Sequence, residues 1–182
     1  MLKTGLFFIK NYQRQPGFTL LEVLITLIVM SIGLLGLAGL QVISLRNNHG
    51  AYLRTQAITQ SYDIVDRMRA NSDQANAGAY AAIGVQTVAC DTAAGCTPAQ
   101  MAGHDLFKWN QANRITLPQG VGIVCRDSTM DDGSYDAATD TVTTNCSNAA
   151  ADPLVVKIWW VDDRAGDPPV PSRFSTVIGD QL

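Results

Sequence analysis

The chain has 182 residues, of which 47% are hydrophobic, and its formal net charge is −3. This length suits one membrane helix and one modest domain better than two domains. Residues 1–17 are basic, with Lys3, Lys10 and Arg14 and no acid, so the rest of the chain is more acidic than the total suggests. An acidic remainder argues against general nucleic-acid binding, which depends on neutralising phosphates with Lys and Arg.

A long apolar segment follows this basic start. It opens with Gly17-Phe18-Thr19-Leu20-Leu21-Glu22, and residues 23–45 contain no charged side chain. Roughly 20 apolar residues cross about 30 Å of hydrocarbon, so the segment can span a membrane. The basic flank predicts a cytoplasmic N-terminus, with everything after Leu45 across the membrane. A carboxylate costs roughly 2.5–3.5 kcal/mol at the bilayer centre and less near an end, so Glu22 needs a partner.

A secretory signal peptide is the other interpretation of a basic and then apolar N-terminus. Such a signal has an apolar core of roughly 7–15 residues, followed by a cleavage site of small residues. Here the apolar stretch is longer, and no clear Ala-x-Ala site closes it. An uncleaved signal anchor is the remaining form of this alternative.

The apolar segment continues into an amphipathic pattern without a helix stop. Apolar residues and one histidine recur there at helical spacing, namely Val42, Leu45, His49, Leu53, Ala57, Ile64 and Met68. We therefore expect one helix from about residue 18 to residue 71, roughly 80 Å long at 1.5 Å per residue. Gly33, Gly36 and Gly39 favour close helix packing, or else a locally weak stretch of helix.

Residues 72–182 are expected to form a small domain. Asn71-Ser72-Asp73 ends the long helix, because these residues favour caps and turns. Thr97-Pro98-Ala99-Gln100 predicts the start of a second helix, with a capping box and Pro at its first position, and Pro118-Gln119-Gly120 ends it.

Three strands are expected after this helix, at 121–126, 154–161 and 174–178, the last an edge strand behind the Pro-rich stretch 167–171. Alternation in the second strand places Val156 and Ile158 on one face, and Lys157 and Trp159 on the other. The predicted fold is α+β, with a small antiparallel sheet on the amphipathic half of the long helix.

The four cysteines all lie beyond the apolar segment, at Cys90, Cys96, Cys125 and Cys146. An exported domain meets an oxidising compartment, and four cysteines allow three pairings, of which proximity favours Cys90 with Cys96 and Cys125 with Cys146. A zinc site is the alternative, but neither pair has the Cys-x-x-Cys form, and His49 and His104 lack ligand spacing.

The acidic stretch 127–136, between Cys125 and Cys146, suggests a calcium loop. If Gly133 took the turn position of an EF-hand, ligand positions would fall on Ser128, Met130 and Asp132, and Met130 cannot ligate. The alternative is an acidic hairpin closed by a disulfide, so no metal or cofactor is assigned. We do not expect an enzyme, because no activated nucleophile, acid and base pair or phosphate loop stands out.

Several of these stretches resemble a known family. Gly17-Phe18-Thr19-Leu20-Leu21-Glu22 before an apolar helix resembles the class III signal of type IV prepilins and pseudopilins. Residues 62–71, 125–128 and 156–164 are similar to PilV-type minor pilins, also called type IV pilus modification proteins. The resemblance implies a pilin-like, disulfide-stabilised fold. It also implies a single-pass protein of the bacterial inner membrane, with a periplasmic domain, that later enters a pilus fibre or tip.

The resemblance also implies how the N-terminus is processed. A prepilin peptidase would remove the leader, residues 1–17, by cutting between Gly17 and Phe18, and would methylate the new amine of Phe18. Residues 18–45 would then form the transmembrane and filament-core half of the helix, 46–71 its amphipathic half and 72–182 the periplasmic domain. Glu22 would pair with the terminal ammonium of a neighbouring subunit.

The expected function is that of a non-catalytic minor pilin that helps to initiate or cap a pilus used in twitching motility, adhesion or DNA uptake. Its partners would be the prepilin peptidase, other minor pilins, the major pilin and, before assembly, inner-membrane lipid. Major pilins commonly carry a proline in this helix, and residues 18–71 contain none. The alternatives are a minor pseudopilin of type II secretion and a DNA-binding or adhesive tip module using Arg114, Arg126, Arg164 and Arg173.

Overall fold

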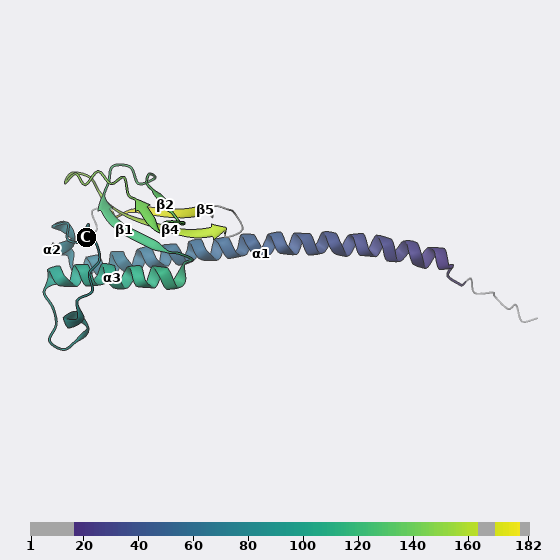
Figure 1. Cartoon of the computed structure of the whole chain (residues 1–182), viewed down its shortest axis with the longest axis horizontal. Coiled ribbons are helices and arrows are strands. Elements are labelled where there is room, and N and C mark those ends of the chain that lie inside the picture. Colours follow the sequence, from purple (N-terminus) through teal and green to yellow (C-terminus); the bar gives the residue numbers. More distant parts are fainter. Residues whose placement is uncertain (1–16, 164–169, 179–182) are drawn as a thin grey trace, which may run out of the picture. The chain divides into compact units, whose positions relative to one another are not determined.

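The computed structural model describes residues 17–163 and 170–178 (Figure 1). The leader cations Lys3, Lys10 and Arg14, together with Arg164 and residues 167–169, lie outside the described residues. The elements are α1 (Leu20–Ala70), α2 (Ser72–Asn76), the 3-10 helix η1 (Val88–Asp91), α3 (Pro98–Thr116), β1 (Val121–Arg126), β2 (Ser134–Asp136), β3 (Thr141–Thr143), β4 (Leu154–Asp163) and β5 (Val170–Ile178). The chain divides into two compact units, 1–46 and 47–182, and α1 contributes to both.

Helix α1 has 51 residues, and its ends lie within about two residues of the predicted ones. In the second unit it buries one stripe, consisting of Leu53, Ala57, Ser61, Ile64, Val65 and Met68. Val42, Leu45 and His49 are exposed, although the periodicity placed them on the same stripe. The packed face of α1 therefore begins at Leu53, about three turns after Val42, where the predicted stripe begins. The helix ends at Ala70, and the short helix α2, which the turn-forming residues did not suggest, follows it.

Helix α3 begins as its sequence predicts. The Thr97 hydroxyl accepts a hydrogen bond from the Gln100 N–H at 3.3 Å, and the Gln100 side-chain oxygen accepts one from the Thr97 N–H at 3.0 Å. This is the reciprocal capping box, with Pro98 as the first helical residue. Further along α3, the indole N–H of Trp109 donates to the Gln60 carbonyl of α1 at 2.8 Å, which joins the two helices.

The main sheet is antiparallel, with strand order β1-β4-β5. The predicted alternation of β4 is confirmed, because one set of side chains joins α1 and α3 in the main core, namely Leu154, Val156, Ile158 and Trp160. The other set includes Trp159 and Val161, which pack with Tyr135 of β2 in a smaller core. Strand β5 lies at an edge as predicted, but it begins at Val170 rather than at residue 174.

A close approach at β1 depends on a glycine. A Cβ added at Gly122 would lie 2.3 Å from Cη2 of Trp109, far inside normal contact distance. Only glycine leaves room for the indole ring between α3 and β1.

Candidate functional site

The residues before α1 form its N-terminal cap. The Thr19 hydroxyl accepts a hydrogen bond from the Glu22 N–H at 3.2 Å, and the Thr19 carbonyl accepts from the Glu22 and Val23 N–H groups at 3.1 and 3.3 Å. Thr19 with Glu22 three residues later is a capping pattern, which the interpretation as a membrane span overlooked. The cap fixes the start of the helix immediately after Gly17 and Phe18.

Glu22 is the only glutamate in the chain, since every other acidic residue is an aspartate. It lies in the first turn of α1 and is exposed. A negative charge there interacts favourably with the positive end of the helix dipole. Within residues 17–163 and 170–178, its carboxylate has no hydrogen-bond or ion-pair partner. The carboxylate is therefore open to a group from outside that part of the chain.

The apolar surface of α1 in the first unit is uncovered. Large hydrophobic side chains between Phe18 and Leu45 are exposed, from 47% at Val23 to 85% at Leu20. Of the helices in the described part of the chain, α1 alone is long and apolar enough to cross a membrane. A helix that is apolar on all sides requires lipid or other apolar helices around it.

The two disulfides lie in the second unit and have the pairings that proximity favours. Cys90 bonds to Cys96 with Cα atoms 4.9 Å apart, and Cys125 bonds to Cys146 with Cα atoms 6.2 Å apart. Because all four sulfurs are in disulfides, the zinc alternative is wrong. His104 instead holds the Cys90–Cys96 loop, since its Nδ1 accepts from the Thr87 N–H at 3.2 Å and its Nε2 lies 3.1 Å from an Asp91 oxygen.

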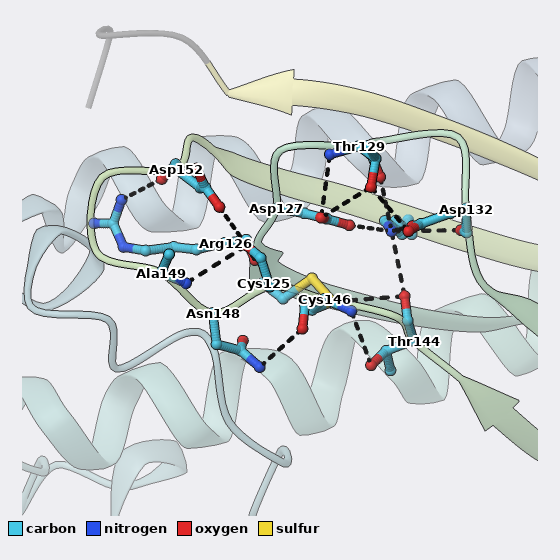
Figure 2. Close-up of a disulfide and its surroundings, with 12 residues drawn as sticks. Cys125, Arg126, Asp127, Thr129, Asp132, Thr144, Cys146, Asn148, Ala149 and Asp152 are labelled. Carbon is cyan, nitrogen blue, oxygen red and sulfur yellow. Dashed lines mark hydrogen bonds and ion pairs between the residues drawn. A yellow bond between two sulfur atoms is a disulfide. The ribbon is translucent and has the colours of Figure 1, made fainter.

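The acidic loop closed by Cys125–Cys146 encloses a lysine. Figure 2 shows Asp127, Thr129 and Asp132 of this loop beside the disulfide, with Thr144 next to Cys146. The Lys157 ammonium donates to Asp127 Oδ2 and Asp132 Oδ1 at 2.5 Å each. It also lies 3.3–3.4 Å from the carbonyl oxygens of Thr129, Asp132 and Thr144. Two carboxylates of the stretch that suggested a calcium loop, those of Asp127 and Asp132, thus bind a cation of the chain itself.

The Lys157 and Asp127 side chains are fully buried, with 0% and 1% of their surface exposed. Burial raises the pKa of the Asp127 carboxyl, but the hydrogen bonds from Lys157 and the Thr129 N–H and the charge of Lys157 outweigh it, so the pKa lies below its usual range. Sequence reasoning placed Lys157 on the correct face of β4 but missed its partners. The available signal was a lysine between Val156 and Ile158, inside an otherwise apolar strand.

Three of the four arginines considered for DNA binding lie in the described residues, and each of these three interacts with the chain itself. Arg114 pairs with Asp140 at 3.1 Å, and Arg126 donates to the Asp152 carbonyl at 2.8 Å. Arg173 donates to carbonyls of the loop that encloses Lys157, at 3.0 Å. These contacts give the described arginines structural roles on three different elements, and they do not favour a tip module that binds DNA.

Two family models match the chain. The model for the prokaryotic N-terminal methylation motif matches residues 12–38, and the Tt1218-like model, described as type IV pilin Tt1218, matches residues 39–107. No curated protein and no solved structure matches. The two matches support the type IV pilin class, a structural and non-catalytic family, and the first covers Gly17, Phe18 and Glu22. The motif and the pilin class together imply processing by a prepilin peptidase, assembly with other pilins and anchoring in a membrane.

Proposed function

We propose that this type IV pilin is a minor, non-catalytic subunit that helps to initiate or cap a pilus. The observation that carries the proposal is the first part of α1, which exposes apolar side chains on all sides directly after the Gly17-Phe18 sequence. Such a surface suits lipid before assembly and the apolar helices of other subunits afterwards. The lack of proline in residues 18–71 and the similarity to PilV-type pilins support the minor role.

Cleavage between Gly17 and Phe18 on the cytoplasmic side is part of this proposal. Both residues precede Leu20, the first residue of α1, so a peptidase can bind this backbone without unwinding the helix. Removal of residues 1–17 would leave a new ammonium on Phe18, and methylation of this amine keeps its charge. Because a positive charge at a helix N-terminus opposes the helix dipole, the new ammonium needs a carboxylate nearby.

Glu22 is the carboxylate that we assign to this ammonium. Opposite charges 4 Å apart attract by roughly 4 kcal/mol at an effective dielectric constant of 20. Phe18 and Glu22 of one chain are only four residues apart at the start of α1, so a pair within one subunit competes with a pair between subunits. Only the second kind joins two helices. Since apolar contacts are non-directional, a charge pair between subunits would set the axial register of otherwise uniform surfaces.

Glu22→Gln in the full chain, expressed in a piliated host, tests this proposal. We expect normal removal of residues 1–17 and at least a tenfold loss of the protein from sheared pili, measured by immunoblot. Asp66→Asn is the matched control, because Asp66 is an exposed acid of α1 that pairs with Arg69 three residues away. Unchanged incorporation of the Glu22→Gln protein would refute the role of the charge pair.

A further inference from the structure

Strand β5 has an unpaired outer edge. It is a terminal strand of the sheet, and its residues pair with β4 on one side (Figure 1). Across the residues that the structure describes, no backbone group of β5 has a backbone partner outside this ladder. The outer edge therefore presents N–H and C=O groups to which another strand can bind.

Protection of this edge is confined to its first half. Pro171 has no N–H to donate, the β4–β5 register shifts between Val161 and Asp163, and Arg173 is the only charged residue of the strand. Prolines, bulges and charges are the devices that prevent edge strands from pairing. Residues 174–178 read Phe-Ser-Thr-Val-Ile and have none of these devices. Their aromatic and β-branched side chains favour strand pairing.

A groove runs beside this unprotected half. It has a volume of about 260 Å³ and lies between β5, at Phe174, Thr176 and Val177, and α1, at Ile58, Tyr62 and Val65. Tyr62 and Val177 are exposed. Because side chains alternate along a strand, every second side chain of an added strand would enter this groove. Ser61 and Arg69 of α1 also line the groove, so it is only partly apolar. An edge strand beside a helix thus offers backbone hydrogen bonds together with a groove for alternate side chains.

The charged side chains beside β5 indicate what kind of segment would bind there. On the other face of β5, the Asp131 side chain is 82% exposed and accepts a hydrogen bond from the Ser175 hydroxyl at 3.2 Å. Arg173 is 4.0 Å from Asp131, but its guanidinium already donates to the carbonyls of Asp132 and Gly133. A second copy of β5 would bring only its own Arg173, whose guanidinium makes the same hydrogen bonds to carbonyls. A different segment with a free lysine or arginine would complement Asp131 better.

We propose that the outer edge of residues 174–178 binds an extended segment of another protein by strand addition. The segment has apolar residues at alternate positions, which enter the groove along α1, and a basic residue on the opposite face, beside Asp131. This surface belongs to the folded domain, so the proposal goes beyond the assembly role of the apolar half of α1 and does not depend on it.

The test uses the full chain in neutral detergent micelles and a labelled peptide of sequence Lys-Val-Thr-Val-Lys-Val-Thr-Val-Lys. Fluorescence anisotropy should show saturable binding, with a Kd below about 1 mM. Tyr62→Lys should weaken binding at least tenfold. Ile115→Lys should leave it within twofold, because Ile115 is 80% exposed on α3 and lies outside the groove lining.

Backbone pairing is tested with two N-methylated forms of this peptide, each methylated at alternate residues so that one edge of the strand is blocked. We expect one form to lose binding and the other to retain it. Equal binding of both forms, or no binding of the parent peptide, would overturn the proposal. A dimer of the full chain that Tyr62→Lys dissociates in sedimentation would also overturn it, because the groove would then belong to a second copy.

Discussion

Lys157→Met should destabilise the folded domain strongly, because it removes the cation from a buried pair and keeps a side chain of similar length. Removing one partner of a buried ion pair costs roughly 3–5 kcal/mol, since the remaining charge is left uncompensated. Asp127 would keep its hydrogen bond from the Thr129 N–H at 3.2 Å, and the Asp132 side chain is already 34% exposed. We therefore expect about 3 kcal/mol, the low end of that range.

Urea unfolding of the full chain in neutral detergent micelles, followed by tryptophan fluorescence, measures this loss. Trp159 is a suitable reporter, because it lies on the same face of β4 as Lys157. The matched control is Lys108→Met, which removes a lysine 36% exposed and 3.2 Å from an Asp91 oxygen, and should cost about 0–1 kcal/mol.

A double variant separates the buried charge from lost packing. Lys157→Met combined with Asp127→Asn should be more stable than Lys157→Met alone, because it also removes the uncompensated carboxylate. A loss below about 1 kcal/mol for Lys157→Met, or a double variant that is less stable than the single one, would refute the reasoning.

Three further predictions concern stability of the same domain in the same assay. Replacing Cys125 and Cys146 with Ser should cost about 3 kcal/mol by loop entropy, against about 2 kcal/mol for the Cys90–Cys96 pair, and an equal or reversed order would contradict this. Gly122→Ala should cost about 1–3 kcal/mol by overpacking against Trp109. Gly103→Ala is the control and should be neutral or stabilising, because Gly103 lies within α3 and its added Cβ would be no closer than 3.7 Å to another residue. Because the pKa of Asp127 is lowered on folding, its stabilising contribution should be full above the unfolded value near 3.9 and should be lost as pH falls through the lower folded value. Asp127→Asn should flatten that acid slope, and an unchanged slope would contradict the ion pair.

Features set by local chemistry could be predicted from the sequence. The start of α3 follows from Thr97, Pro98 and Gln100, which lie within one turn and form the capping box. The two faces of β4 follow from the alternation of side chains along a strand, which does not depend on the residues that the strand contacts. The long helix was predictable because its apolar residues continue into an amphipathic pattern without a break.

Features that depend on tertiary contacts, or on a competing local signal, were missed. Asp127 lies 30 residues before Lys157, so only the folded sheet brings them together. Pro171 was placed in the Pro-rich stretch before the last strand, yet β5 contains it, because an edge strand can lack an N–H on its outer side. The Thr19 cap was visible in the sequence, but it was missed because the apolar run that follows was interpreted only as a membrane span. Cleavage, methylation and the charge pair of Glu22 stay predictions.

Intact-mass analysis of this protein from sheared pili tests the central claim most directly, because one spectrum reports incorporation and processing together. The proposed function predicts a species that begins at Phe18, carries one added methyl group and retains both disulfides. A protein that keeps residues 1–17, begins at another residue or is absent from the pili would contradict it.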